Sequence, residues 1–322
     1  MYVLGLEGTA HTIGGSVVTD DGEVLSNVFK TYKEKEGIHP REAANHHASR
    51  VVKIIQSCIN EADIKKEDID VVAFSQGPGL GPCLRTTATA ARSLSLSLGV
   101  PLVGVNHCIA HLEIGRLRTK AENPILLYVS GGNTQVIAFS KGRYRVFGET
   151  LDIGLGNMLD KFGREKGMTF PAGPLIEEKA KQSDNLVNLP YSVKGMDVEF
   201  SGIMTAALNK DDTLEDICHS IQETTFAMLT EVTERALAHV RKDEVLLGGG
   251  VVQNKRLQSM IKTMTEERGA DWYVPEPEFC VDNAAMIAWT GYLMYNSGSS
   301  INVDDSNIKQ KFRTDQVEVT WR

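Results

Sequence analysis

Short apolar runs, typical of buried strands, alternate along the chain with longer segments whose apolar residues recur at helical spacing. Strands are expected over residues 2–6, 13–18, 69–74, 102–105, 125–129, 135–139 and 245–247. Helices are expected over residues 41–62, 84–98, 214–241, 254–267 and 283–295. This alternation indicates an α/β protein that ends, beyond residue 297, in a polar and irregular tail.

One pattern occurs twice: a strand, a turn of small or glycine residues and a returning strand, at Val3–Val18 and at Leu126–Phe139. Two such turns can direct backbone N–H groups at one polyphosphate from opposite lobes. A third segment, Gly248–Gly250, follows an apolar strand and suits close approach to a nucleotide. Any one glycine cluster is explained by turn geometry alone, but three of them directly after strands favour a two-lobed nucleotide-binding protein.

Composition narrows the class of protein. The 322 residues suggest about two domains, and 42% hydrophobic with 24% charged residues excludes a disordered chain. The net charge of −8 does not favour nucleic-acid binding through bulk electrostatics, so a local basic patch or a partner would have to attract a polynucleotide.

The spacing of the cysteines and the length of the apolar runs predict the cellular compartment of the protein. Five scattered cysteines without a C-x-x-C motif are typical of reduced thiols, each a small buried side chain. No apolar run approaches the roughly 20 residues of a membrane span, and no basic, apolar leader opens the chain. We expect a soluble, cytoplasmic protein without a membrane partner.

His107 and His111 are the first candidate metal ligands. If residues 108–117 are helical, the i, i+4 spacing places both imidazoles on one face, where they can bind one cation. The alternative is two ordinary histidines satisfied by hydrogen bonds. A zinc protease would need a glutamate after the first histidine, and Cys108 occupies that position, which disfavours proteolysis.

Asp282 and Tyr128 are candidates for completing such a site. Asp282 stands just before the last expected helix, where its carboxylate would either cap the helix or serve as a third ligand. Two histidines and one carboxylate suit iron, zinc or manganese and leave positions open for substrate oxygens. Tyr128, at the end of its strand, can add a phenol oxygen.

Together these motifs resemble the universal tRNA threonylcarbamoyladenosine transferase family, in its archaeal and eukaryotic branch, formerly labelled O-sialoglycoprotein endopeptidase. The resemblance extends over nearly the whole chain. It is carried by residues 4–12, 77–81, 106–111, 129–134, 151–154, 160–161, 200–202, 248–254, 282–283 and 312–315.

The resemblance implies the two-lobed actin/Hsp70/sugar-kinase fold, with duplicated mixed-sheet domains and a nucleotide and metal cleft between them. The lobes are expected at residues 1–123 and 124–300, followed by a tail at 301–322. It also implies one divalent metal ion per subunit, first Fe²⁺ and otherwise Zn²⁺ or Mn²⁺. The implied ligands are His107, His111 and Asp282, with Tyr128 as a further ligand or near neighbour.

The resemblance further implies binding of threonylcarbamoyl-AMP or an ATP-type nucleotide. The residues that match nucleotide-binding positions of the family are Ser130, Gly131, Gly132, Asn133, Asp160, Gly173, Glu177 and Asn254, with Tyr128 beside them. The general base is not identified, and Asp160 or a substrate carboxylate are the candidates. The chain departs from the family by alanine at Ala172 and Ala284, where the family has glycine.

The implied reaction transfers an L-threonylcarbamoyl group from threonylcarbamoyl-AMP to N6 of adenosine 37 in tRNAs that read ANN codons. The implied partners are tRNA and the KEOPS subunits: a small atypical protein kinase, a small dimerising subunit and a further small subunit. Lys161, Arg164 and Lys166 would contact tRNA phosphate or simply form a solvated helix face. The alternatives are an ATPase or kinase of the same fold and a non-catalytic nucleotide-binding scaffold.

Overall fold

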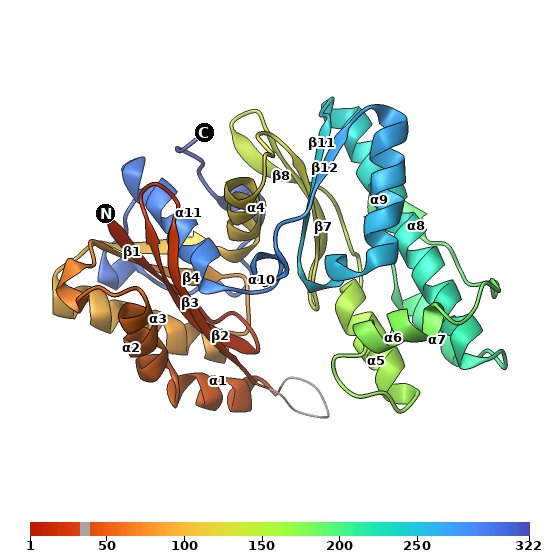
Figure 1. Ribbon diagram of the computed structural model, residues 1–322, viewed down its shortest axis with the longest axis horizontal. Helices are drawn as coiled ribbons and strands as arrows, with labels where there is room; N and C mark the ends of the chain where they lie inside the picture. Colours follow the sequence, from red (N-terminus) through yellow and green to blue (C-terminus); the bar gives the residue numbers. More distant parts are fainter. Residues whose placement is uncertain (33–38) are drawn as a thin grey trace. The chain divides into compact units, whose positions relative to one another are not determined.

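The computed structural model of the chain describes residues 1–32 and 39–322. The chain divides into two units, each containing one five-stranded sheet (Figure 1). The first unit is Met1–Arg118, Gly142–Tyr144 and Asp282–Arg322, and the second is Thr119–Lys141 and Arg145–Val281. In the described ranges, no helix combines the length and the apolar character that a membrane crossing requires.

The first sheet has the order β3-β2-β1-β4-β5. The neighbours β1–β2 and β2–β3 are antiparallel, whereas β1–β4 and β4–β5 are parallel. The strands are β1 (Tyr2–Glu7), β2 (Thr12–Thr19), β3 (Val24–Thr31), β4 (Val71–Gly77) and β5 (Leu102–Asn106). Because side chains alternate along a strand, Leu4 and Leu6 join one core cluster, while Gly5 faces the opposite side of the sheet.

Helices cover both faces of this sheet. The helices α2 and α3 pack on one face, with α1 against α3, while α11 packs on the other face and against α4. Their bounds are α1 (Pro40–Ala48), α2 (Val51–Glu61), α3 (Gly81–Leu98), α4 (His107–Arg118) and α11 (Ala284–Asn296). Three short 3₁₀ turns are η1 (Lys66–Asp68), η3 (Val303–Asp305) and η4 (Thr314–Gln316).

Two glycines explain how closely α11 approaches the first sheet. A Cβ on Gly5 would lie 2.4 Å from the backbone nitrogen of Ala288, and one on Gly291 would lie 2.3 Å from the Cβ of Ala73. Only residues without side chains fit at both positions, so the helix lies directly on the strands. This packing places Asp282, just before α11, in the first unit, whereas the sequence had grouped it with residues 124–300.

The second sheet has the order β12-β11-β6-β7-β8. The pair β6–β7 is antiparallel, whereas β11 is parallel to both β6 and β12. The strands are β6 (Ile125–Val129), β7 (Thr134–Ser140), β8 (Arg143–Glu149), β11 (Glu244–Gly248) and β12 (Asp271–Tyr273). Read from β6, the strand order repeats that of the first sheet, which confirms the duplication expected from the sequence.

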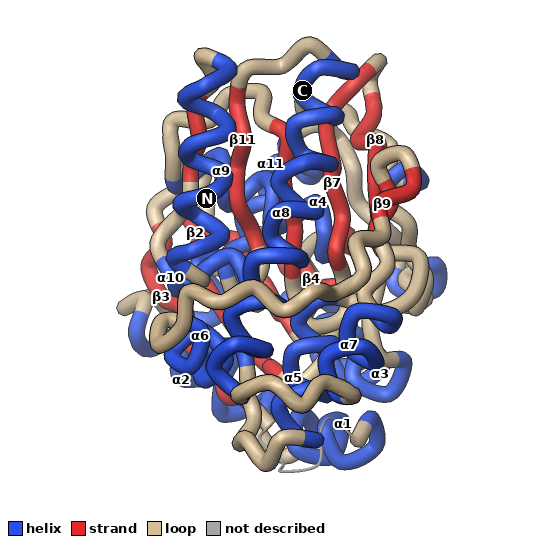
Figure 2. Tube along the Cα trace, turned by 90° about the vertical axis from the view of Figure 1, so that its right-hand side faces the viewer, coloured by secondary structure: helices blue, strands red, loops and turns tan. Residues whose placement is uncertain are grey.

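Two long helices, α8 (Leu214–Val240) and α9 (Lys255–Arg268), run side by side along this sheet (Figure 2). The shorter helices are α5 (Leu155–Glu165), α6 (Gly173–Ala180), α7 (Ser201–Leu208) and α10 (Pro277–Cys280), with the 3₁₀ turn η2 (Gly250–Gln253). A small ribbon pairs β9 (Val193–Lys194) with β10 (Asp197–Val198).

The expected helix at 41–62 is wrong in one respect, because it is two helices. Ser49 ends α1, and its hydroxyl donates a hydrogen bond to the carbonyl of His46 at 2.9 Å. Such a local side-chain bond competes with continuation of the helix. The periodicity did not reveal the break, since Val51, Ile54 and Cys58 keep helical spacing within α2.

Candidate metal centre

The helix α4 begins directly where β5 ends. Asn106 is the last residue of β5, and its Oδ1 accepts the N–H groups of Cys108 and Ile109 at 3.0 and 3.2 Å. These bonds satisfy donors that the first turn of a helix otherwise leaves unpaired. The helix expected around His107 and His111 therefore forms, and the two residues lie one turn apart on it.

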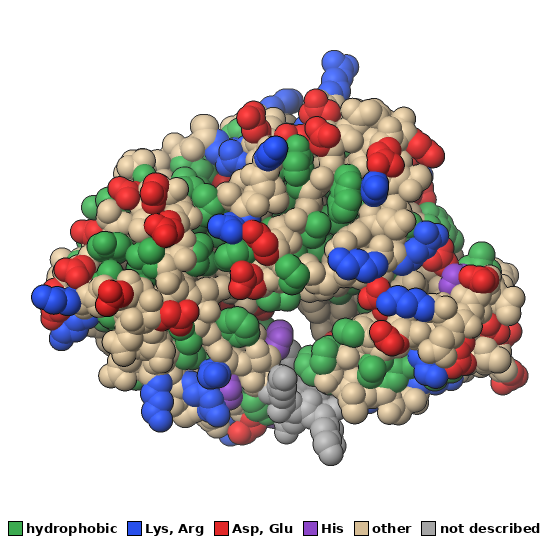
Figure 3. Space-filling model, viewed as in Figure 1, with side chains coloured by type: hydrophobic (Ala, Val, Ile, Leu, Met, Phe, Trp, Pro, Cys, Tyr) green, Lys and Arg blue, Asp and Glu red, His purple; other side chains and the backbone are tan. Residues whose placement is uncertain are grey.

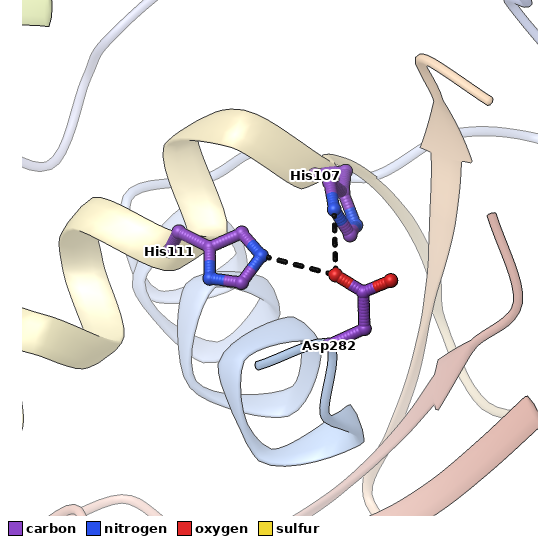
Figure 4. Close-up of side chains that lie close together, drawn as sticks. All are labelled: His107, His111 and Asp282. Atoms are coloured by element: carbon purple, nitrogen blue, oxygen red, sulfur yellow. Dashed lines mark hydrogen bonds and ion pairs between the residues drawn. The ribbon is translucent and has the colours of Figure 1, made fainter. Parts of the chain in front are cut away.

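The imidazoles of His107 and His111 converge on one oxygen of Asp282 (Figure 4). The Oδ1 atom of Asp282 lies 3.3 Å from Nε2 of His107 and 3.4 Å from Nε2 of His111. The three ligand atoms lie within 4.8 Å of one another, and within the described part of the chain no other His, Cys, Asp or Glu group has this spacing. Both histidines are buried and the side chain of Asp282 is 18% exposed, so solvent reaches the group at Asp282.

Asp282 is not the cap of the last helix. The N-cap of α11 is the next residue, Asn283, whose Oδ1 accepts the N–H of Met286 at 3.0 Å. The capping alternative for Asp282 is therefore wrong. Its carboxylate turns toward the histidines instead, which agrees with the ligand alternative.

Glu7 is a site residue that the sequence reasoning missed. Its side chain is fully buried at the end of β1, and its Oε2 lies 3.1 Å from Nδ1 of His107. Its Oε1 accepts both the N–H and the hydroxyl of Thr9, at 2.8 and 2.6 Å. A carboxylate on Nδ1 fixes the ring so that Nε2 faces the metal position, an arrangement common around metal-binding histidines. The available signal was an acidic residue ending a strand that is otherwise apolar.

Electrostatics favour the metal-binding protonation states of His111 and Asp282. Burial lowers the pKa of His111, against the opposing effect of its hydrogen bond to Asp282. Burial alone would raise the pKa of Asp282, but His107 and His111 outweigh it and hold that pKa well below its usual range. Near neutral pH a neutral His111 therefore faces an ionised Asp282, and these are the forms that bind metal ions.

The donor set fits a divalent cation. Two imidazole nitrogens and one carboxylate oxygen on one side of an ion leave coordination positions open, as in sites for iron, zinc or manganese. The buried carboxyl group of Glu7 behind His107 supplies the outer support that such a ligand requires. Tyr128, the fourth residue of the expected ligand set, is buried in β6 of the second unit.

The turn between β6 and β7 carries the expected phosphate-binding residues. The N–H of Ser130 donates to the carbonyl of Asn133 at 2.8 Å, and the N–H of Asn133 donates to the Ser130 hydroxyl at 3.2 Å. Gly131 and Gly132 at its tip are exposed, and a Cβ on Gly132 would meet no atom within 4 Å. The turn is thus closed at its base by its own hydrogen bonds and open at its tip.

The third glycine segment lies beside this turn. Gly249 has a φ of +94°, and a Cβ there would lie 2.2 Å from the carbonyl oxygen of Val129. Glycine is therefore required at this position for both backbone conformation and space. Two of the three glycine segments noted in the sequence thus meet within the second unit.

The remaining expected nucleotide residues lie around the first residues of α6 and α9, which Asp160 and Glu177 contact from positions within α5 and α6. Asp160 accepts the N–H of Ala172 at 2.8 Å, just before Gly173 begins α6. Asn254 caps α9, and Glu177 accepts the N–H of Lys255 at 3.2 Å beside it. Glu177 and Asn254 therefore meet at one helix end, and their part in nucleotide binding stays a prediction.

Comparison with known proteins gives a family. A family model described as tRNA N6-adenosine threonylcarbamoyltransferase matches residues 23–289. A protein of that name from Methanococcoides burtonii is 57% identical, with 99% of this chain and 97% of the relative covered. Another of that name, from Thermococcus sibiricus, is 55% identical over the full length of both.

Other relatives are longer. A probable bifunctional tRNA threonylcarbamoyladenosine biosynthesis protein from Methanocaldococcus jannaschii is 58% identical over the whole of this chain. The chain spans about 60% of the length of that relative and of a similar bifunctional protein from Methanosarcina mazei.

Solved structures show the fold. HypF of T. kodakarensis has a TM-score of 0.65 at 15% identity, covering 91% of this chain and 48% of HypF. A ROK hexokinase from Thermus thermophilus has a TM-score of 0.57 at 15% identity, covering 92% of this chain and all of the hexokinase. The chain has the α/β fold of the actin/Hsp70/sugar-kinase class, as the family resemblance implied.

Proposed function

Because the chain belongs to the tRNA N6-adenosine threonylcarbamoyltransferase family, we propose that it transfers an L-threonylcarbamoyl group from threonylcarbamoyl-AMP to N6 of adenosine 37 in tRNA. A bond forms between N6 and the carbamoyl carbon, the bond from that carbon to the phosphate oxygen breaks, and AMP leaves. The amine loses one proton. The observation that carries the proposal is the His107–His111–Asp282 group in a member of this family.

His107, His111 and Asp282 would hold one divalent ion, Fe²⁺ first and Zn²⁺ or Mn²⁺ as alternatives, with Tyr128 as a further ligand or neighbour. When bound, the ion supplies Lewis-acid stabilisation of the negative charge that builds up as AMP departs. Glu7 keeps Nε2 of His107 turned toward Asp282. The protein's part is to hold these ligands in a fixed geometry.

The second unit would bind the nucleotide. The exposed tip of the turn, Gly131–Gly132, offers backbone N–H groups to phosphate oxygens. Glu177 can accept hydrogen bonds from both ribose hydroxyls, and Asn254 offers a donor and an acceptor. Asp160 is our candidate for accepting the proton of the attacking amine. Since an exocyclic adenine amine is a weak nucleophile, positioning carries much of the barrier.

The net charge of this chain does not attract tRNA, so local basic residues or partner proteins must bind it. On the face shown in Figure 3, acidic and basic side chains are interspersed, in keeping with a net charge of −8. Lys161 and Arg164 are exposed on α5 and would contact tRNA phosphate locally. We propose that KEOPS subunits, including the small atypical kinase and the small dimerising subunit, supply the remaining attraction.

The test is a transfer assay with isotopically labelled threonine. The protein is incubated with unmodified tRNA and an enzyme that makes threonylcarbamoyl-AMP, and the label in tRNA is read by nucleoside mass spectrometry. His111→Ala is compared with wild type and with His219→Ala, a matched change on α8 in the second unit.

We expect label with wild type and His219→Ala and none with His111→Ala. Absence of label with wild type, even after KEOPS subunits are added, would contradict the transferase and favour an ATPase or kinase. Label that persists in His111→Ala would remove the role proposed for the metal group.

A further inference from the structure

The last 22 residues, 301–322, form what we call the C-terminal strap. The strap begins on the first sheet, where Ile301 pairs with Leu102 of β5. It continues past the middle of α3 and the end of β4. There Arg92 donates from Nε to the Ser306 hydroxyl at 2.7 Å, and Gln76 donates from Nε2 to the Asn307 carbonyl at 2.8 Å. The tail expected to be irregular is thus irregular in conformation but fixed in place.

The middle of the strap contacts the start of α4. Asn106 donates from Nδ2 to the carbonyl of Phe312 at 3.0 Å, while its Oδ1 caps the helix. The side chain of Thr314, two residues further along the strap, is buried. The contact of Asn106 with Phe312 lies directly beside His107, the first candidate ligand.

The end of the strap contacts α4 again, beyond His111. Trp321 donates from its indole Nε1 to Oε1 of Glu113 at 2.9 Å. The carboxylate of Glu113 is fully buried, and it also accepts hydrogen bonds from Tyr144 and, at 2.7 Å, from Arg116. The strap therefore holds the ligand-bearing part of α4 on both sides.

We propose that the C-terminal strap is a positioning element of the metal centre, with Trp321 acting through Glu113 on the orientation of α4. The inference rests on the proposed function only in treating His107, His111 and Asp282 as a metal site. Neither Trp321 nor Glu113 is a ligand, so both are positioning residues.

The geometry supports this role over simple stabilisation. Both histidines lie on α4, whereas Asp282 lies just before α11, so a small rotation of α4 changes both histidine-to-carboxylate distances together. Functional groups need their supporting contacts fixed to about 0.5 Å, and outer partners of metal ligands are commonly worth 10–100-fold in metal affinity. The contacts on Asn106 and Glu113 bracket the single turn that separates the two histidines.

The experiment compares Trp321→Phe and Trp321→Ala with wild type and with Trp272→Phe. Trp321→Phe removes the indole donor but keeps an aromatic ring. Trp272 lies in β12 of the second unit and serves as the matched control. Two readouts are taken on the full chain: Co²⁺ affinity with the visible absorption spectrum of bound Co²⁺, and the melting temperature without metal.

We expect Trp321→Phe to weaken Co²⁺ binding about tenfold and to alter the Co²⁺ spectrum. Trp321→Ala should weaken Co²⁺ binding further. Trp272→Phe should keep the wild-type affinity and spectrum, even if its melting temperature falls equally. Wild-type affinity and spectrum in both Trp321 variants would overturn the positioning role while leaving the metal centre intact. Absence of Co²⁺ binding by the wild type would instead overturn the metal centre itself, and with it the strap's role.

Discussion

The two sheets share one strand order, but their first turns differ. After β1, the side chains of Glu7 and Thr9 fill the turn, are buried and contact His107. After β6, the corresponding turn presents Gly131 and Gly132 to solvent. One supersecondary unit thus supports the proposed cation site where a carboxylate and a hydroxyl fill the turn beside His107, and we infer an anion site where glycines leave the turn open.

The glycine loops that follow β4 and β11 differ in the same way. In the first unit, a Cβ on Gly77 would lie 1.9 Å from the carbonyl oxygen of Lys309, so the strap covers that loop. In the second unit, Gly249 packs on Val129, but a Cβ on Gly250 would find only Val281, at 3.9 Å. The two loops occupy equivalent places in the two sheets. The strap packs over the loop after β4, whereas the loop after β11 is open at Gly250.

The largest effect is expected when a proposed metal ligand of the first unit is removed. His111→Ala should lower Co²⁺ affinity by more than about 100-fold, because losing a metal ligand costs more affinity than losing a residue that only orients a ligand. Binding of an AMP-type nucleotide should change little, since its proposed residues lie in the second unit. Titration calorimetry with each ligand measures both, and equal loss of the two affinities would contradict the division.

Glu7→Gln tests whether the filled turn supports the cation site. The amide keeps the volume but loses the charge that faces Nδ1 of His107, so Co²⁺ affinity should fall by roughly 10–100-fold. Glu178→Gln, an exposed glutamate on α6, is the control and should have no effect. Unchanged Co²⁺ affinity in Glu7→Gln would mean that His107 needs no carboxylate to orient its ring.

Gly5→Ala tests how α11 brings Asp282 to the site. The new Cβ overlaps Ala288, so α11 must shift, at a cost of about 1–3 kcal/mol in the free energy of unfolding. Co²⁺ affinity should fall as well, because Asp282 precedes that helix. Gly202→Ala on α7, where a Cβ meets no atom within 4 Å, is the control. Denaturant unfolding and Co²⁺ titration are the measurements, and full stability in Gly5→Ala would refute the close packing.

His47 is a second buried imidazole of the first unit, and burial lowers its pKa as it lowers the pKa of His111. Burial, with His46 and His11 adding to it, lowers the pKa of His47 to about 4 from its usual 6.5. Between these values the unfolded chain binds the extra proton, so stability is full above pH 6.5 and falls toward pH 4. From pH 7 to 5 the loss should be about 2 kcal/mol.

His47→Gln should remove that part of the pH dependence. Urea unfolding at pH 7 and pH 5 compares the variant with wild type. The same loss in both proteins would assign the acid sensitivity to other groups.

The smallest expected effect is that of Gly132→Ala. Because a Cβ meets no atom there, stability should stay within about 0.5 kcal/mol of wild type. The methyl group would occupy the open tip of the turn, so affinity for an AMP-type nucleotide should fall about tenfold. Titration calorimetry measures whether the turn binds the nucleotide. A wild-type nucleotide affinity in Gly132→Ala would mean that the nucleotide binds elsewhere.

The sequence was informative where chemistry depends on neighbours along the chain. The i, i+4 spacing of His107 and His111 predicts their common face, and apolar runs predict the central strands. The roles of Glu7 and Trp321 could not be predicted from the sequence, because each depends on a contact with a residue about 100 or more positions away. The division of residues 41–62 was missed for a local reason, the hydroxyl of Ser49, which periodicity does not register.

We propose that the His107–His111–Asp282 group holds an ion on which transfer depends. The most direct test strips the protein with a chelator and follows single-turnover transfer from threonylcarbamoyl-AMP to tRNA while Fe²⁺, Mn²⁺ or Zn²⁺ is added back. We predict a rate that rises and saturates at one equivalent of the native metal per chain. A rate that is the same in the stripped and the loaded protein would contradict it.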